Sequence, residues 1–144
     1  SSVTAIEPSP LFQEILGDDA EIAAAVAAGV LRIKGGIALS MPYVATSSVD
    51  VIFAMNVVYF LTPLAEYLEE MLRVLKPGGL VIFGYKAGVV NGNKNHFVNT
   101  DTAQIVGAMT AAGFAGARQE ADRLEDAGSN SYTPNTAPRA LRAY

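Results

Sequence analysis

The chain contains no cysteine and only one histidine, His96. The absence of cysteine excludes disulfides, thiolate nucleophiles and zinc–thiolate sites, and one histidine cannot form a histidine-rich metal site. No apolar run reaches the roughly 20 residues that a membrane-spanning helix needs, and the N-terminus lacks a basic start followed by an apolar stretch. These absences predict a cytoplasmic protein with no metal centre and no membrane partner.

Positive charge is also scarce. Ten lysines and arginines face 14 aspartates and glutamates, which gives a net charge of -4 and a pI near 4.9. Such a chain has no general attraction to phosphate backbones, so nucleic acid is not an expected partner. Of its 144 residues, 51% are hydrophobic and 17% charged, which fits one globular domain spanning residues 1–144.

Short apolar or β-branched runs alternate with stretches whose apolar residues repeat at helical spacing. This alternation predicts an α/β fold with a doubly wound sheet. The run 49–55 is apolar nearly throughout, as expected of a central strand that helices cover on both faces. Strands are predicted at 2–6, 30–34, 49–55, 80–85, around 115–123 and at 139–144, and helices at 11–28, 64–75 and 101–112.

Helix boundaries carry recognisable signals. Asp18 or Asp19 is predicted to cap the second part of the first helical stretch, and Thr100-Asp101 to cap the helix that follows. Lys76-Pro77-Gly78-Gly79 is predicted to end the helix before it, because proline and glycine do not continue a helix.

Two connected motifs carry a resemblance to a known family. Residues 48–60 read SVDVIFAMNVVYF, and residues 72–79 read LRVLKPGG and precede an apolar strand. Together they resemble the fourth- and fifth-strand region of class I S-adenosylmethionine-dependent methyltransferases, in particular the methyltransferase type 11-like domain. The similarity extends to residues 6–9, 36–43 and 112–114. It implies a Rossmann-like sheet, mostly parallel with an antiparallel C-terminal strand.

The family begins one strand earlier than this chain, with a glycine-rich loop around the methionine part of the cofactor. That strand lies between the ones predicted here at 2–6 and 49–55. We therefore expect a domain that is truncated at its N-terminus or completed by another polypeptide. Two open strand edges would favour pairing into a homodimer.

Glu7 and Pro8 are candidate cofactor residues, because Glu7 stands where a strand ends and a helix begins. A carboxylate there can accept two hydrogen bonds from ribose hydroxyls, and in the resembled family this acid holds the cofactor ribose. The alternative is an exposed acid that the following helix N-terminus stabilises.

Ile37 and Ala38 follow the second predicted strand, in the loop that resembles the adenine side of the family's site. Many relatives place an aspartate there, whereas this chain has Ile37. An apolar wall and the Ala38 backbone would then bind the adenine ring. Simple packing of the loop is the alternative.

Asn56, Val57 and Tyr59 follow the strand 49–55, at the carboxyl edge where ligands of open α/β sheets bind. The resemblance implies that the Asn56 and Val57 backbone faces the methionine part of the cofactor, with Tyr59 on the acceptor side. Alternatively, Asn56 caps the sheet end and Tyr59 packs under the next helix.

Tyr85, Lys86 and His96 lie beyond the fifth strand, on the side where relatives bind the acceptor. A solvated loop position is the alternative for His96. No catalytic base is assigned, since methyl transfer from a sulfonium can rely largely on positioning.

The function implied is S-adenosylmethionine-dependent methyl transfer to a small-molecule acceptor. One alternative is a methyltransferase-like binding or regulatory module without activity. Another is a nicotinamide-dependent Rossmann enzyme, since an acid after the second strand also serves ribose there.

Overall fold

The computed structural model describes residues 1–86, 97–119 and 138–143. The chain divides into two compact units, Ser1–Met41 and Pro42–Tyr144, and each is described by itself. No helix among the described residues is both long and apolar enough to cross a membrane.

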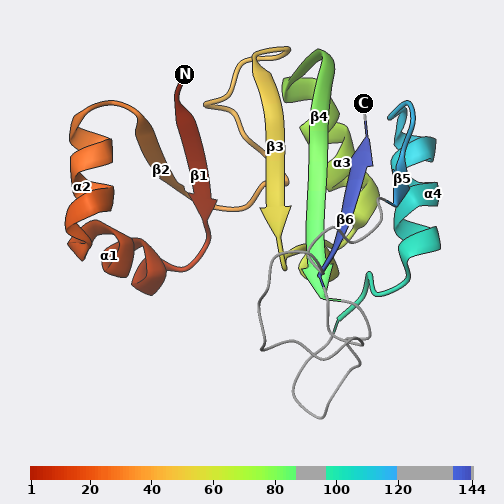
Figure 1. The fold of residues 1–144 in the computed structure, drawn as a ribbon, viewed down its shortest axis with the longest axis horizontal. Helices are drawn as coiled ribbons and strands as arrows, with labels where there is room; N and C mark the ends of the chain where they lie inside the picture. The colour runs from red at the N-terminus through yellow and green to blue at the C-terminus, as the bar shows by residue number, and fades with distance from the viewer. Residues whose placement is uncertain (87–96, 120–137, 144) are drawn as a thin grey trace, which may run out of the picture. The chain divides into compact units, whose positions relative to one another are not determined.

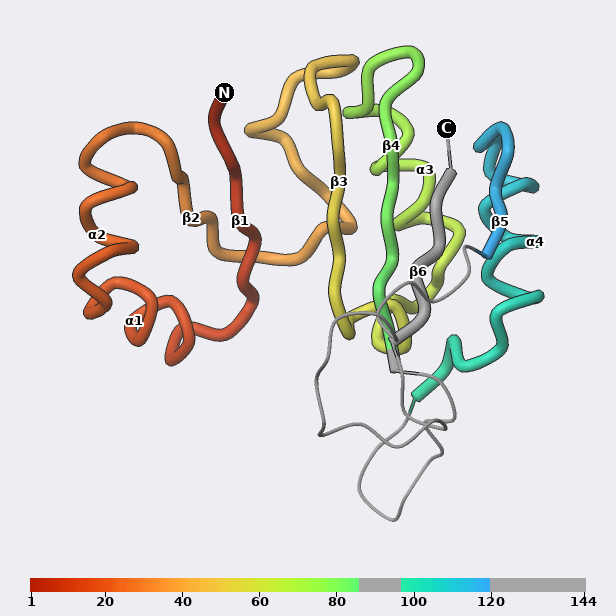
Figure 2. Tube along the Cα trace, in the orientation of Figure 1, coloured from red at the N-terminus to blue at the C-terminus, as the bar shows by residue number. Residues whose placement is uncertain are grey.

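The first unit is a strand–helix–helix–strand segment. Its strands pair in parallel, with Val3 opposite Leu31 and Glu7 opposite Gly35. Figure 2 shows the chain leaving β1, passing through both helices and returning along β2. Parallel pairing requires such a crossover, and helices usually supply it. The elements are β1 (Val3–Glu7), α1 (Pro10–Asp18), α2 (Ala20–Ala27) and β2 (Leu31–Gly35).

Both helices of this unit begin at side-chain caps. Ser9 precedes Pro10 at the start of α1, and its Oγ accepts a hydrogen bond from the Phe12 N–H at 3.3 Å. Asp19 Oδ1 accepts from the backbone N–H groups of Glu21 and Ile22. These bonds satisfy donors that have no partner within the helix. The predicted cap at Asp19 is confirmed.

The second unit contains a four-stranded sheet in the order β3-β4-β6-β5. β3 and β4 are parallel, and β6 runs antiparallel to both of its neighbours. The α/β class and the antiparallel C-terminal strand are thus confirmed. Its elements are β3 (Val49–Met55), the 3-10 helix η1 (Val58–Phe60), α3 (Leu64–Val74), β4 (Leu75–Lys86), α4 (Thr102–Ala112), β5 (Arg118–Gln119) and β6 (Pro138–Ala143).

The core of this unit lies between β4 and the helices α3 and α4. Figure 1 shows α3 behind β4 and β6, with α4 beside β5. The largest fully buried side chains come from these elements and from η1, and burial of such side chains is the main favourable term in folding. They are Val58, Leu68, Val74, Val81, Phe83, Tyr85, Ile105 and Met109.

The prediction that helices cover β3 on both faces is wrong for the described residues. Val51, Phe53 and Met55 are exposed, Phe53 to 62%. Side chains alternate along a strand, so these three share the face that points away from the core. β3 pairs only with β4 among the described strands, and no described helix of this unit covers that face. The apolar sequence predicted the strand but not which of its faces is covered.

The Lys-Pro-Gly-Gly segment forms an irregularity at the start of β4 rather than a free turn. α3 ends at Val74, and Leu75 already pairs with Val49. The register then shifts before Leu80 pairs with Val51, and Gly78 has φ +78°, which favours glycine. The helix therefore ends at Val74, one residue before the predicted end at Leu75.

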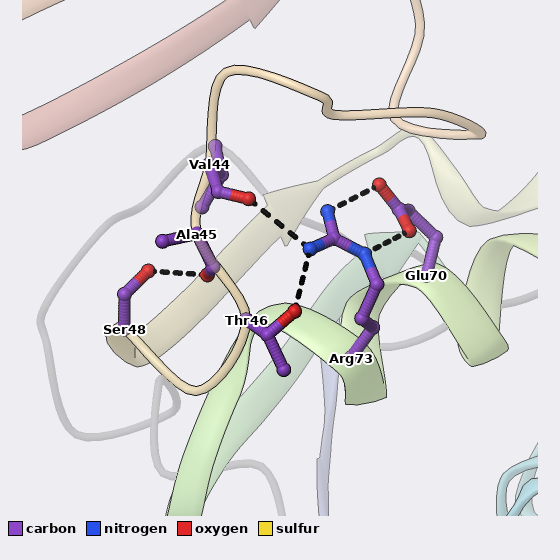
Figure 3. Close-up of polar contacts among 6 residues, drawn as sticks. All are labelled: Val44, Ala45, Thr46, Ser48, Glu70 and Arg73. Atoms are coloured by element: carbon purple, nitrogen blue, oxygen red, sulfur yellow. Dashed lines mark hydrogen bonds and ion pairs between the residues drawn. The ribbon is translucent and has the colours of Figure 1, made fainter.

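Arg73, near the end of α3, fixes the loop that leads into β3 (Figure 3). Its guanidinium makes a two-pronged contact with Glu70, with Nε 2.6 Å from Oε2 and Nη2 2.8 Å from Oε1. Nη1 donates to the Val44 carbonyl oxygen at 3.2 Å and to Thr46 Oγ1 at 3.1 Å. The rigid fork of arginine suits this combined geometry better than lysine would.

The same cluster affects two ionisable groups. The hydrogen bond to Glu70 raises the pKa of Arg73 above its ordinary value. Burial, and then the negative charge of Glu70, raise the pKa of the Tyr43 hydroxyl. Both shifts favour the protonated form of the group.

Candidate functional site

Glu7 lies at the carboxyl end of β1, directly opposite the last residue of β2, Gly35. Its Oε1 accepts a hydrogen bond from the Ser9 N–H at 2.8 Å, and its backbone carbonyl accepts one from Gln13 Nε2 at 2.9 Å. The side chain is half-buried, and Oε2 makes no hydrogen bond to the described residues. The carboxylate is thus held in one orientation with an oxygen left to accept.

The prediction for Glu7 did not include its supporting residues. Ser9 was signalled by its place before a proline at a helix start, which is typical of a cap. Gln13 had no such signal, because its contact depends on how α1 folds back over β2. A Cβ at Gly35 would lie 3.1 Å from Gln13 Nε2, so glycine leaves room for this side chain.

Pro8, Ile37 and Ala38 lie close to the same edge of the two-stranded sheet. Pro8 follows Glu7 and is exposed, while Ile37 and Ala38 come two and three residues after Gly35. Ile37 is 48% exposed and Ala38 half-buried. The first unit therefore brings a fixed carboxylate and an exposed apolar side chain to one sheet edge, where ligands of open α/β sheets bind.

Asn56 stands at the carboxyl end of β3 in a left-handed conformation, with φ +55°. Asparagine tolerates this region better than most residues. Its backbone N–H donates to the Gly84 carbonyl oxygen at 2.6 Å, which extends the pairing of β3 and β4 by one step. Its side-chain Oδ1 accepts from the Tyr59 hydroxyl at 2.8 Å. Val57 follows and is 39% exposed.

Four aromatic rings meet near the carboxyl ends of β3 and β4. The Tyr59 ring lies 5.4 Å from Phe60, 6.4 Å from Tyr85 and 5.0 Å from Phe97, measured between centroids. Tyr59 and Tyr85 are buried, and the Tyr85 hydroxyl forms a hydrogen bond with Thr102 Oγ1. Edge-on aromatic contacts of this kind hold rings in defined positions.

Asn99 joins the segment before α4 to η1 and was not predicted. Its Nδ2 donates to the carbonyl oxygens of Val58 at 2.8 Å and Leu61 at 2.7 Å. Nearby, the Val98 N–H donates to the Tyr59 carbonyl oxygen at 3.0 Å. The bonded residues are 41 and 38 positions apart in the chain, so no local pattern signals them.

Replacing Asn99 with alanine is expected to lower the free energy of unfolding by about 1–2 kcal/mol, because two carbonyls lose their donor. Urea denaturation would measure the change. Thr100→Ala, at the exposed neighbouring position, is the control and should change stability by less than about 0.5 kcal/mol. Equal stability of the two variants would contradict this role.

The two remaining candidates are less fully described. Lys86 is the last residue of β4, and its side chain lies outside the described part of the structure. His96 also lies outside the described residues. Within the described ranges, no three residues of the types that bind metal ions are grouped as a metal site.

One comparison with known proteins identifies a family. The profile of the family described as "Methyltransferase domain" matches residues 1–83, which is more than half of the chain. A comparison with curated proteins gave no significant match.

Several solved structures share the fold at low sequence identity. The [4+2]-cyclase SpnF is 18% identical with a TM-score of 0.70, and the match covers 99% of this chain and 65% of SpnF. A putative sarcosine dimethylglycine methyltransferase from Galdieria sulphuraria is 15% identical with a TM-score of 0.71, with 99% and 69% covered. The trans-methyltransferase CalH, in complex with SAH, is 17% identical with a TM-score of 0.69, with 99% and 42% covered. The chain thus spans about two thirds or less of two of these proteins.

Proposed function

Because the chain belongs to the methyltransferase domain family, we propose that it transfers a methyl group from S-adenosylmethionine to a small-molecule acceptor. S-adenosylmethionine is the cofactor of this family, and CalH was solved with SAH, the product left after methyl transfer. When bound, the cofactor supplies a methyl group on a positively charged sulfur. The two units together form one methyltransferase-like domain in this proposal.

The fixed carboxylate of Glu7 is the observation that carries the proposal. A ribose presents two neighbouring hydroxyl donors, and an ionised carboxylate is an acceptor for both. The Ser9 N–H holds Oε1, so the group needs little reorganisation before Oε2 accepts from a hydroxyl. The residues of the first unit therefore fit the ribose of this cofactor.

The adenine side is assigned to the loop after β2. Ile37 exposes an apolar side chain there, and an aromatic base needs such a flat apolar contact together with a few backbone groups. Ala38 supplies the backbone in this assignment, and Pro8 lies beside Glu7.

The second unit is assigned to the methionine part and the acceptor. The Asn56 and Val57 backbone follows β3 at the carboxyl edge of its sheet. Tyr59, Tyr85, Lys86 and His96 remain assigned to the acceptor side. Since the Tyr59 and Tyr85 hydroxyls both form internal hydrogen bonds, these residues would shape the site rather than accept a proton. The reaction then depends on positioning of acceptor and cofactor.

Calorimetric titration of the full-length protein with SAH tests the proposal. Saturable binding is expected, and NAD⁺ in a parallel titration should give none. A folded protein that binds neither SAH nor NAD⁺ would instead support a binding or regulatory module. Binding of NAD⁺ without SAH would support the nicotinamide-dependent alternative.

A further inference from the structure

Tyr59 and Asn56 form a hydrogen-bonded pair at the carboxyl end of β3. Tyr59 is only 6% exposed, and its ring touches three other rings. Its hydroxyl nevertheless reaches the side chain of Asn56, a residue whose own side chain is exposed. The buried Tyr59 hydroxyl thus fixes the orientation of the exposed Asn56 amide.

The direction of this hydrogen bond decides what the amide offers. Asparagine has one acceptor oxygen and an NH2 group with two donors. Oδ1 of Asn56 takes the Tyr59 proton, so the Nδ2 group points away from Tyr59. Nδ2 makes no hydrogen bond to the described residues. The pair therefore presents two uncharged N–H donors at the carboxyl end of β3.

The surroundings favour an anionic partner for these donors. Residues 54–61, from the end of β3 through η1, contain neither an acidic nor a basic side chain, and residues 82–85 of β4 contain none either. An arriving carboxylate meets no like charge from these two segments. N–H donors that are fixed in advance bind such an oxygen without the cost of ordering a side chain.

We infer that Tyr59 is a positioning residue, which holds the Asn56 amide so that Nδ2 donates to a carboxylate of the bound ligand. The inference rests on the proposed function and assigns that carboxylate to the amino-acid end of the cofactor. Tyr59 itself does not touch the ligand. Its role differs from the acceptor contact that the sequence suggested.

Two ligands and three variants of the full-length protein test the assignment. SAH carries the amino-acid carboxylate, whereas methylthioadenosine has the same nucleoside and sulfur without it. Tyr59→Phe keeps the ring and removes the hydroxyl. Asn56→Asp keeps Oδ1 and tolerates a positive φ, but replaces the donors with an oxygen. Tyr67→Phe, on the buried face of α3, is the matched control.

Tyr59→Phe is expected to weaken SAH binding roughly three- to tenfold, because the Asn56 amide is no longer held in the orientation that donates to the carboxylate. Asn56→Asp is expected to weaken it about tenfold, because the N–H donors are replaced by a negatively charged oxygen. Methylthioadenosine should bind both variants as it binds the wild type, and Tyr67→Phe should alter neither affinity. The double variant should lose no more than Asn56→Asp alone, since both changes act through one amide.

Three results would overturn the inference while leaving the cofactor proposal standing. Unchanged SAH binding by Tyr59→Phe would remove the positioning role. Equal weakening of both ligands would show that the substitution disturbs the sheet end as a whole. Methylthioadenosine and SAH binding the wild type with equal affinity would show that the carboxylate is not recognised. If the wild type binds neither ligand, the cofactor proposal itself fails, and this assignment fails with it.

Discussion

Replacing Phe83 with alanine is expected to lower the free energy of unfolding by about 3–5 kcal/mol, the usual cost of emptying a buried phenylalanine site. Phe83 is fully buried on β4, on the same side of the strand as Val81 and Tyr85. Its backbone is paired on both sides, with Ala54 of β3 and Leu141 of β6. Because β4 is held by a neighbouring strand on each side, the protein can collapse only a little around the cavity that the substitution leaves.

Chemical denaturation followed by circular dichroism would measure this loss. Phe53→Ala is the matched control, because Phe53 occupies the adjacent strand on the exposed face. It should cost about 1 kcal/mol or less. A loss below 1 kcal/mol for Phe83→Ala would contradict the placement of the core. A loss for Phe53→Ala as large as for Phe83→Ala would show that another part of the protein covers this face.

The same strand shows what a sequence pattern can and cannot convey. The bounds of β3 were predicted without error, because a run of apolar residues between polar turns marks a strand. The exposure of β3 was not predicted, since burial of a strand depends on what packs on its faces. A nearly continuous apolar run indicates only that both faces of the strand carry apolar side chains.

Helix caps were predictable for a different reason. Asp19 and Asp101 each bond to backbone N–H groups two and three residues ahead, so the whole interaction lies within four residues. Local sequence therefore contains all of the relevant information. The left-handed backbone of Asn56 and the contacts of Asn99 lie at the other extreme, because tertiary structure determines them.

For the candidate site, the sequence located strand ends but not side-chain orientations. Glu7 and Asn56 were both predicted, and both stand at carboxyl ends of strands. The hydrogen bonds from Ser9 and Tyr59, which orient them, were not predicted. These bonds matter for function, since the fold alone does not determine the reaction. SpnF, a [4+2]-cyclase, shares the fold with methyltransferases.

The residue on which the cofactor proposal depends can be tested directly. Glu7→Gln is expected to weaken SAH binding about 10- to 100-fold, because a charged acceptor for two hydroxyl donors is lost. Glutamine retains one oxygen, which can still accept from the Ser9 N–H, so the start of α1 should remain intact. The measurement is the dissociation constant from calorimetry on the full-length protein.

Glu14→Gln, which removes the same charge from an exposed position of α1, is the control and should bind SAH normally. Methylthioadenosine distinguishes loss of the ribose contact of Glu7 from loss of the carboxylate contact of Asn56, because it keeps the ribose and lacks the amino acid. Glu7→Gln should weaken both ligands equally, whereas Asn56→Asp should weaken SAH alone. Wild-type affinity of Glu7→Gln for SAH would leave Glu7 as an acid that merely stabilises the N-terminus of α1.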